Sequence, residues 1–272
     1  MMNLKDKVVV ITGAGSGMGR AYAMVYAEAG AHLALNDFDA LSLQETADMY
    51  GGSGCFSSAF DVSDRAAMFA FAEQVIARFG RVDIVINNAG VSGGFKPIWE
   101  LTVDDMDRTM RINFGGVVNG TQAFLPHMLA AHQGQIVNVS SIFGLVGSPN
   151  HGDYSASKFA VRGFTEALMT ELQETGVTAH LVHPGGIATN IGMVDGVEQD
   201  FSKHYLVTSP EDIAYHVRKA LTQGRAKIVY GKDSFKTWLG SNFVPTGMLA
   251  KIIWRDIKPV LDLAPYAKVK KR

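Results

Sequence analysis

Short apolar runs rich in β-branched residues recur along the chain, and longer stretches with helical spacing separate them. Seven such runs are present, at residues 7–13, 31–37, 54–60, 82–87, 135–140, 177–183 and 225–230. They show little strict alternation of apolar and polar residues, which is typical of parallel strands covered by helices on both faces. Because crossovers between parallel strands are right-handed, the pattern predicts an α/β fold with a doubly wound sheet of about seven parallel strands.

The chain has 272 residues, and no shift in composition marks a second core. We therefore expect one catalytic domain over residues 1–230. Residues 231–272 are less regular and contain several helix breakers, among them Pro245 and Pro259. We expect this extension to pack on the same domain, on a partner subunit or on a membrane surface.

A glycine-rich turn, TGAGSGMG at residues 12–19, follows the first predicted strand and opens a helix. Small residues let the backbone approach a pyrophosphate, and the free N–H groups at the helix start attract its charge. The competing interpretation is a turn that needs glycine only for packing. The candidates for cofactor contact are Gly13, Ser16, Gly17, Met18 and Gly19.

Asp37 ends the second predicted strand, where the adenosine ribose of a dinucleotide would lie. Its carboxylate would accept hydrogen bonds from both ribose hydroxyls and repel a 2′-phosphate. Its sequence neighbours, Asn36 and Phe38, are not basic. NAD is therefore favoured over NADP. Asp37 is alternatively an N-cap for the helix starting near Ala40, but Asp39 suits that role better.

Two further strand ends carry candidate cofactor residues. Asp61 and Val62 follow the third strand and would meet the adenine, although Asp61 or Ser63 equally fits the role of helix cap. The sequence NNAG at residues 87–90 ends the fourth strand, and its small residues permit close approach of a cofactor. Asn88, Ala89 and Gly90 are the candidates there, while the amides alternatively join neighbouring strand ends by hydrogen bonds.

A serine, a tyrosine and a lysine fall within residues 138–158 in an arrangement suited to hydride-transfer chemistry. Ser141 follows an apolar strand, and Tyr154 and Lys158 lie four positions apart on one helical face. The Tyr-x-x-x-Lys spacing is weak evidence alone, because it recurs at Tyr215 and Tyr266, where we expect solvated faces. Only Tyr154 is preceded by a strand that ends in serine.

Asn113 interrupts a helical pattern and is followed by two glycines, so we expect a local opening of the helix there. Such a site would hold a water between Asn113 and Lys158. The plain alternative is a packing residue.

These motifs together resemble the short-chain dehydrogenase/reductase family, in its branch of single-domain enzymes of about 250 residues. The resemblance covers roughly residues 5–230 and includes a P-G-x-x-x-T motif at residues 184–189. It implies a Rossmann fold, a nicotinamide cofactor and a homodimer or homotetramer. It also implies that Asn113, Ser141, Tyr154 and Lys158 are catalytic and that Tyr154 and Lys158 contact the cofactor. Further cofactor contacts are implied for Pro184, Gly185, Ile187 and Thr189.

Free tyrosine has a pKa near 10, so a tyrosine that acts as a base at neutral pH needs nearby positive charge. We expect Lys158 and an oxidised nicotinamide to supply it. Tyr154 would then be the general base in alcohol oxidation and the general acid in ketone reduction. Ser141 would hold the substrate oxygen.

The predicted substrate pocket is mostly apolar. Its walls are expected from residues 91–99, 143–146 and 190–209, with Phe95, Phe143, Leu145, Val146, Ile191 and Met193 as lining residues. This lining favours a small hydrophobic secondary alcohol or ketone of steroid, terpenoid, lipid or alicyclic type. We expect His151, Asn150 and Lys203 to be surface loop residues. No metal site is expected, since His180 and His183 lack clustered partners.

The net charge and the cysteine content indicate the cellular compartment and the kinds of partner. The net charge is −1 and there is one cysteine, Cys55, which favours a reducing, cytoplasmic protein that does not bind nucleic acid. Residues 230–272 nevertheless carry nine Lys/Arg against three Asp/Glu, together with several aromatic residues. That segment either caps the pocket, packs against a partner subunit or makes a peripheral membrane contact.

Two other functions remain open at this stage. One is reduction of a 3-oxoacyl thioester on a carrier protein, which commonly uses NADPH and is disfavoured by Asp37. The other is a nucleotide-binding sensor that catalyses nothing, which is disfavoured by the complete set of candidate catalytic residues.

Overall fold

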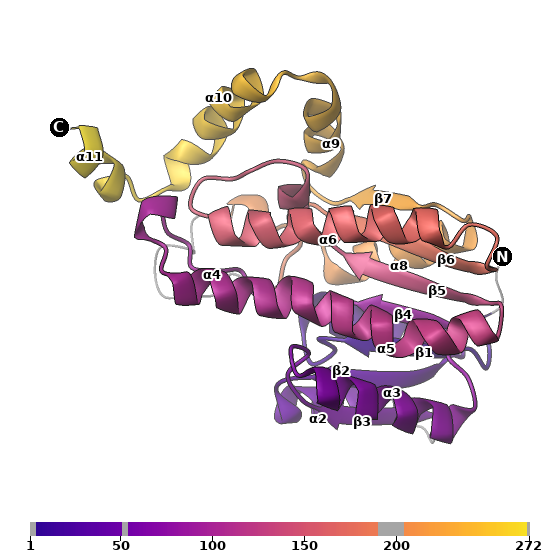
Figure 1. Ribbon diagram of the computed structural model, residues 1–272. Helices are drawn as coiled ribbons and strands as arrows, with labels where there is room; N and C mark the ends of the chain where they lie inside the picture. The colour runs from indigo at the N-terminus through magenta and orange to yellow at the C-terminus, as the bar shows by residue number, and fades with distance from the viewer. Residues whose placement is uncertain (1–3, 51–53, 190–203, 271–272) are drawn as a thin grey trace.

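The computed structural model describes residues 4–50, 54–189 and 204–270. Its strands are β1 (Val8–Thr12), β2 (His32–Asp37), β3 (Cys55–Ala59), β4 (Ile84–Asn87), β5 (Gly134–Val139), β6 (Val177–Pro184) and β7 (Lys227–Tyr230). All pairs are parallel, in the order β3-β2-β1-β4-β5-β6-β7. The predicted seven-stranded, doubly wound sheet is confirmed (Figure 1). Each of the seven predicted runs overlaps one of these strands, although β5 begins one residue before its run and β6 ends one residue after its run.

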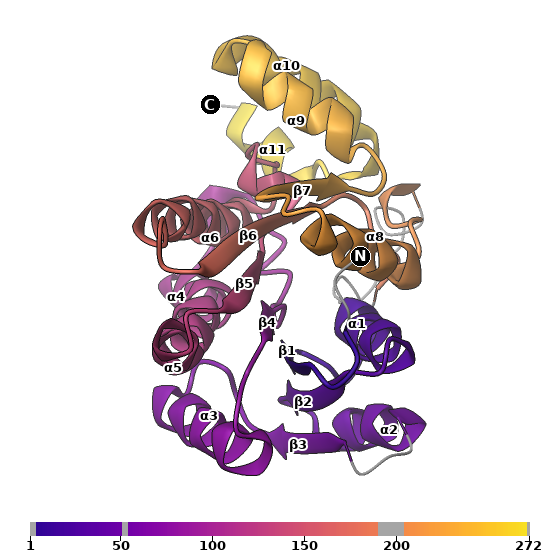
Figure 2. The same ribbon diagram turned by 90° about the vertical axis from the view of Figure 1, so that its right-hand side faces the viewer.

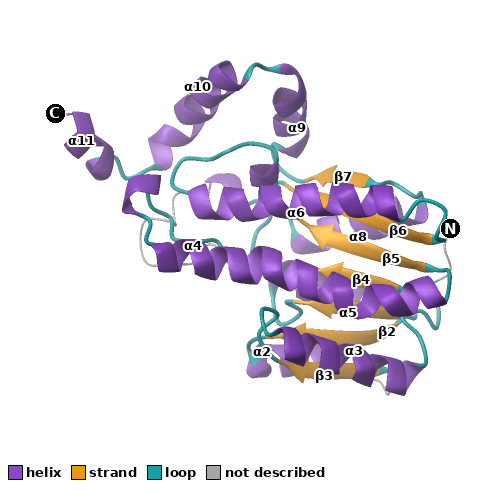
Figure 3. Cartoon of the chain, viewed as in Figure 1, coloured by secondary structure: helices purple, strands orange, loops and turns teal. Residues whose placement is uncertain are grey.

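Helices cover both faces of the sheet (Figures 2 and 3). One face carries α1 (Gly17–Glu28), α2 (Ala40–Tyr50) and α8 (Pro210–Thr222). The other carries α3 (Arg65–Phe79), α4 (Val103–Met110), α5 (Gly116–Ala130) and α6 (Gly152–Glu171). Short helical turns are η1 (Ile98–Glu100), η2 (Arg111–Gly115) and η3 (Ile142–Gly144).

Each face has its own apolar core. Tyr22 and Tyr26 of α1 are fully buried against the first face, and Phe71 and Phe124 of α3 and α5 against the second. Strands buried on both sides explain why their sequences lack alternation. The chain crosses from one edge of β1 to the other between β3 and β4, and ligands of such sheets bind beyond the strand ends at that point.

The C-terminal extension forms α9 (Ser234–Phe243), α10 (Thr246–Ile257), η5 (Lys258–Val260) and α11 (Ala264–Lys270). These elements lie beyond the β7 edge and on the carboxyl side of the strands (Figure 1). None of the helices in the described part of the chain combines the length and the hydropathy that a bilayer span requires.

Candidate active site

The glycine-rich turn joins β1 to α1, and two of its glycines have positive φ angles, +68° at Gly13 and +51° at Gly17. A Cβ atom at Gly13 would lie 2.8 Å from the Cα of Ala89, and one at Gly19 would overlap the carbonyl oxygen of Gly13. The packing role considered for these glycines is therefore present. The same turn leaves the first turn of α1 without a side-chain cap, so its backbone N–H groups remain available to an anion.

Asp37 stands at the end of β2, and its carboxylate accepts hydrogen bonds from the backbone N–H groups of Gly15 at 2.7 Å and Asp39 at 2.9 Å. Asp39 instead accepts from the N–H of Leu41 and the hydroxyl of Ser42 at the start of α2. The assignment of the capping role to Asp39 is thus confirmed, and Asp37 marks the corner beside the glycine turn.

The immediate sequence neighbours of Asp37 did not reveal a basic residue that lies close to it in the structure. The Arg20 guanidinium, from α1, donates to the carbonyl oxygens of Gly15 and Ser42 and pairs with the Glu45 carboxylate at 2.9 Å. The sequence could have indicated this proximity, because Arg20 directly follows Gly19 and the first turn of α1 faces the end of β2, where Asp37 lies. Glu45 offsets its charge, so the corner is not a ready phosphate site.

Asp61 and Val62 follow β3. The Asp61 carboxylate accepts from the N–H of Ser63 at 2.8 Å, but the N-cap of α3 is Asp64, which accepts from Ala67 at 3.0 Å. The expectation that Asp61 or Ser63 caps this helix is therefore wrong by one to three residues. The backbone oxygen of Val62 accepts from the Asn119 side chain at 3.0 Å.

The two asparagines after β4 join strand ends. Asn87 donates to the Asn138 side chain at 2.8 Å, and Asn88 donates to the backbone oxygens of Thr12 at 3.0 Å and Gly13 at 3.3 Å. Asn88 also lines the cavity described below, so its structural role leaves it beside a ligand. Of the two residues that follow Asn88, Ala89 faces the glycine-rich turn. Gly90 faces the catalytic candidates Asn113 and Lys158.

Asn113 lies in η2, a π-helical turn inserted between α4 and α5, so the predicted local opening is present. Its side chain accepts from the N–H of Val91 at 2.7 Å and donates to the carbonyl of Val91 at 2.9 Å. It also donates to Ser157 at 3.0 Å, which in turn donates to the carbonyl oxygen of Tyr154 at 2.7 Å. The asparagine thus ties the loop after β4 to the helix that carries Tyr154.

Ser141, Tyr154 and Lys158 converge beyond the carboxyl end of β5. The Ser141 and Tyr154 side chains share a hydrogen bond, and the Lys158 Nζ atom lies 5.6 Å from the centre of the Tyr154 ring. Lys158 also donates to the carbonyl oxygen of Val139 at 3.1 Å. His183 donates from Nδ1 to the Ser141 carbonyl at 2.8 Å, a structural hydrogen bond between the ends of β6 and β5.

Burial controls the acidity of this group. It raises the pKa of Tyr154, and the hydrogen bond with Ser141 opposes that rise. Burial also lowers the pKa of Lys158 to about 8. The expectation that Lys158 and an oxidised nicotinamide together lower the tyrosine pKa stays a prediction, since only the lysine belongs to the chain.

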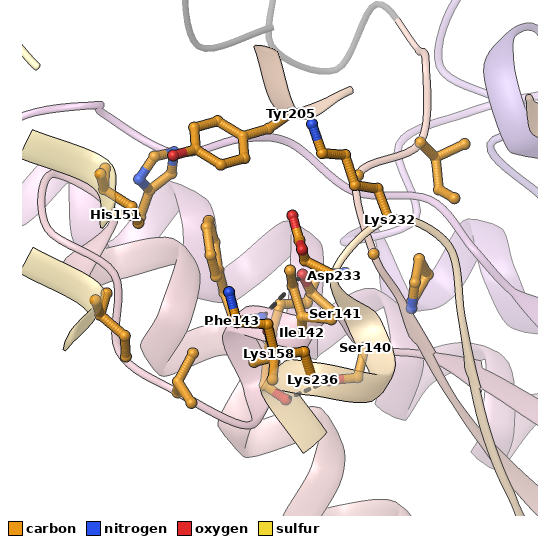
Figure 4. Close-up of a pocket in the computed structure, with 18 of the residues that line it drawn as sticks. Ser140, Ser141, Ile142, Phe143, His151, Lys158, Tyr205, Lys232, Asp233 and Lys236 are labelled. Atoms are coloured by element: carbon orange, nitrogen blue, oxygen red, sulfur yellow. Dashed lines mark hydrogen bonds between the residues drawn. The ribbon is translucent and has the colours of Figure 1, made fainter. Parts of the chain in front are cut away.

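A cavity of about 510 Å³ extends from these residues to the C-terminal helices (Figure 4). The predicted cofactor residues that line it are Met18, Asn88, Tyr154, Lys158, Pro184, Gly185, Ile187 and Thr189. Of the predicted substrate residues, Phe143 and Val146 line the cavity, whereas Leu145 is buried but is not part of the lining. Phe95 contacts the ring of the lining residue His151, with 4.8 Å between ring centres. Ile191 and Met193 lie outside the described residues.

The far wall of the cavity comes from the C-terminal extension, for which capping of the pocket was one of the expected alternatives, although none of its residues was among the named lining candidates. Its lining residues there include Leu239, Phe243, Leu249, Ile252, Ile253 and Ile257. On α10 they recur at spacings of three and four, so they form one helical face. That amphipathic spacing was the signal that would have predicted this wall.

The loop before α6 corrects two further expectations. His151 is 5% exposed and lines the cavity, and Asn150 is 6% exposed and accepts from the Tyr266 hydroxyl at 2.7 Å. Tyr266 also packs against Trp99 and Trp254, with ring centres 5.2 and 5.0 Å away. His151 and Asn150 are therefore buried, and Tyr266 is half-buried and not on a solvated face. Burial lowers the pKa of His151 to about 4, so its ring is neutral at pH 7. Lys203 lies outside the described residues.

Among the described residues there is no cluster of three or more histidine, cysteine or acidic side chains placed to bind a metal.

Comparisons with known proteins identify related chains. A sequence model of the family described as short chain dehydrogenase matches residues 7–199. The SadH protein of Mycobacterium tuberculosis is 41% identical over 247 residues, which cover 86% of this chain and 89% of that protein. Cyclopentanol dehydrogenase of Comamonas testosteroni is 38% identical over 192 residues, covering 70% and 76% respectively.

A solved short-chain dehydrogenase/reductase from Burkholderia phymatum, in complex with NAD, is 31% identical and superposes with a TM-score of 0.79. The superposition covers 84% of this chain and 90% of the other. A short-chain dehydrogenase from Mycobacterium paratuberculosis bound to NAD is 27% identical, with a TM-score of 0.75 over 84% and 97% of the two chains.

Proposed function

The chain belongs to the short-chain dehydrogenase/reductase family, and on that basis we propose that it is an NAD-dependent oxidoreductase that interconverts a hydrophobic secondary alcohol and its ketone. One observation carries the proposal. Ser141, Tyr154 and Lys158 meet at one end of a mostly apolar cavity whose adjoining wall is made by Met18, Asn88 and the end of β6.

The residues at the switch point of the sheet fit a dinucleotide. The glycine turn offers backbone N–H groups where a pyrophosphate would lie, and the absence of side chains at Gly13 and Gly19 is required by the close backbone packing. Asp37, held by Gly15 and Asp39, is placed to accept hydrogen bonds from ribose hydroxyls. The carboxylate would repel a 2′-phosphate, so we assign NAD as the cofactor.

A bound nicotinamide supplies the hydride acceptor in oxidation and the hydride donor in reduction. In oxidation Tyr154 takes the hydroxyl proton of the alcohol while the C–H bond of the carbinol carbon gives up its hydride, leaving the ketone. In reduction Tyr154 returns that proton to the oxygen. Ser141, already hydrogen-bonded to Tyr154, holds the substrate oxygen beside the phenol.

Lys158 contributes a positive charge to the proposed catalytic residues. Its pKa of about 8 leaves it mostly protonated at pH 7, and its ammonium stabilises the negative charge that develops on Tyr154. Because burial raises the tyrosine pKa, the lysine alone does not ionise the phenol. We infer that the positive charge of the oxidised cofactor is required as well. Asn113 supports a water in the proton path, and Gly90 leaves space between it and Lys158.

The substrate assignment rests on the cavity. Its volume of about 510 Å³ and its apolar walls suit an alicyclic, terpenoid, steroid or lipid alcohol better than a sugar. The similarity to a cyclopentanol dehydrogenase supports the alicyclic class. We assign residues 1–230 as the catalytic domain and 231–272 as an extension that closes its pocket. By its family and composition we propose a cytoplasmic homodimer or homotetramer.

A spectrophotometric screen tests this function. Purified protein is offered NAD or NADP with cyclic, terpenoid and steroid secondary alcohols, and reduced nicotinamide is followed by its absorbance. We expect turnover with NAD and an apolar cyclic alcohol. The proposal fails if polyols are oxidised and cyclic alcohols are not, or if NADP is preferred throughout.

A further inference from the structure

The α9 and α10 helices present an exposed apolar surface at the edge of the molecule. Figures 1 and 2 show these two helices as the outermost elements beyond β7. Five large apolar side chains on them are exposed, and we name this set the hairpin patch: Phe235 (66%), Leu239 (45%), Phe243 (75%), Met248 (59%) and Ile252 (38%). A cluster of this kind on one protruding element marks an interaction site.

The hairpin patch is continuous with the cavity. Leu239, Phe243 and Ile252 belong to the patch and also line the cavity, so the cavity meets solvent among them. The lining beyond that mouth is mostly apolar, and its charged residues besides Lys158 are Lys232, Asp233, Lys236 and Asp256. An apolar molecule that enters here therefore passes from one mainly apolar surface to another.

Basic side chains flank the patch. Lys236 of α9 and Lys251 and Arg255 of α10 are exposed, and none of them forms an ion pair with an acid in the described part of the chain. Met248 and Lys251 are three positions apart on α10, and so are Ile252 and Arg255, so apolar and basic side chains share the outer side of the helix. Such an arrangement suits a lipid surface, in which anionic headgroups lie above apolar acyl chains.

We propose that the hairpin patch docks on an anionic lipid surface, with the mouth of the cavity opening toward the acyl chains. The apolar side chains would enter the boundary between headgroups and acyl chains, while the lysines and the arginine contact the headgroups. This inference rests on the proposed function, because it supplies the route by which an apolar alcohol or ketone reaches Tyr154.

A second copy of the chain fits the patch less well. An isologous contact between two copies sets the same patch of each copy against the other across a twofold axis. The exposed charged residues on α9 and α10 are Lys236, Lys251, Arg255 and Asp256. A patch with a surplus of cations would then face the same surplus, which opposes association. An anionic lipid surface has the complementary charge.

Vesicle flotation with the full-length chain tests the proposal. The probes are phosphatidylcholine vesicles with and without roughly a third of phosphatidylserine, at low and high salt. We expect binding to the anionic vesicles that weakens with salt. Two double variants outside the cavity lining are informative: Phe235→Ser with Met248→Ser, and Lys251→Glu with Arg255→Glu. We expect the first to weaken binding at least about tenfold and the second at least about thirtyfold.

Matched control variants distinguish docking through the hairpin patch from nonspecific binding of exposed apolar residues. Leu41 and Met49 of α2 are 80% and 53% exposed and lie at the opposite end of the sheet, so Leu41→Ser with Met49→Ser should bind vesicles like the parent. All variants should oxidise a water-soluble cyclic alcohol at the parental rate. The proposal is overturned if the parent does not float, if the hairpin variants float equally well, or if the parent self-associates without vesicles and the hairpin variants abolish that. A protein that floats but oxidises nothing would refute the dehydrogenase and leave docking intact.

Discussion

The Asp153 carboxylate accepts a hydrogen bond of 2.8 Å from the backbone N–H of Gly94, and so joins the first turn of α6 to the loop after β4. The same oxygen accepts from the Thr109 hydroxyl of α4 at 2.9 Å, and Asp153 is fully buried. Since Asp153 directly precedes Tyr154, one side chain positions both the proposed base and the loop beside it.

Replacing Asp153 should therefore disturb substrate binding more than cofactor binding. In Asp153→Ala the buried Thr109 hydroxyl and the half-buried Gly94 N–H lose their acceptor, which should lower the free energy of unfolding by roughly 2 kcal/mol. We expect the KM for the alcohol to rise about tenfold with little change in NAD affinity. Asp153→Asn keeps an acceptor oxygen and should recover part of both effects. The exposed Asp104 is the control, and equal kinetics for Asp104→Ala and Asp153→Ala would refute this positioning role.

Tyr154→Phe should remove turnover while leaving the cavity and the cofactor site in place. Loss of the acid/base group should lower kcat by roughly a thousandfold. The matched control is Tyr215→Phe, because Tyr215 also has a lysine four residues later but is 41% exposed on α8. Stopped-flow turnover and NAD titration by fluorescence give the two readouts. Near-parental oxidation by the Tyr154 variant would show that another group carries the proton.

Asp37→Ala should change the choice of cofactor. Loss of the carboxylate removes the ribose acceptor and the repulsion of a 2′-phosphate, and it leaves Arg20 of the same corner in place. We expect the preference for NAD over NADP, measured as the ratio of kcat/KM values, to fall by roughly a hundredfold. Asp39→Ala removes only the cap of α2 and should cost about 1 kcal/mol of stability with an unchanged ratio. A ratio that moves equally in both variants would assign the effect to the fold.

Filling the far end of the cavity should discriminate between large and small substrates. Ile253 of α10 lines the cavity, whereas the nearby Ala250 is exposed and does not. Ile253→Trp should lower kcat/KM for a polycyclic alcohol at least about tenfold and leave a five-membered cyclic alcohol nearly unaffected, since only the larger molecule reaches α10. Ala250→Trp should affect neither. Equal losses for both substrates would mean that α10 does not bound the substrate site.

The sheet and its switch point were predictable because parallel strands and crossover helices leave local signals. The apolar runs gave all seven strands, and the glycine turn located the β1–α1 junction, where Gly13 and Gly17 adopt positive φ angles. The local opening of the helix at Asn113 was predictable because poor helix formers interrupt a helical pattern there. These features depend on residues close in sequence.

The features that were missed depend on contacts between distant residues. His151 and Asn150 have the composition of a surface loop. Asn150 is buried and bonded to Tyr266, more than 100 positions away, and His151 is buried among the rings of Phe95, Phe143 and Tyr154. The cap of α3 was misplaced because Asp61, Ser63 and Asp64 are all good caps. The desolvation that raises the pKa of Tyr154 depends on its burial, which the sequence pattern does not quantify.

Two buried histidines should make the protein acid-labile. Burial lowers the pKa of His151 and of His183 to about 4, from an ordinary value of 6.5. Between these values the unfolded chain binds protons that the folded chain does not, so stability is full above pH 6.5 and falls as the pH drops toward 4. Each histidine accounts for about 3 kcal/mol at most over that window.

Urea unfolding between pH 4.5 and 7.5 measures this dependence. We expect the parent to lose stability steadily below pH 6.5, and His151→Gln and His183→Gln each to flatten the curve, because glutamine does not titrate. The exposed His132, replaced by Asn to suit its φ angle of 51°, should leave the slope unchanged. Activity separates the two sites, since His183 supports the Ser141 carbonyl while His151 lines the cavity. His183→Gln should therefore lower kcat, and His151→Gln should change mainly the KM for the alcohol. A parental slope in both glutamine variants would show that neither histidine is held neutral by the fold.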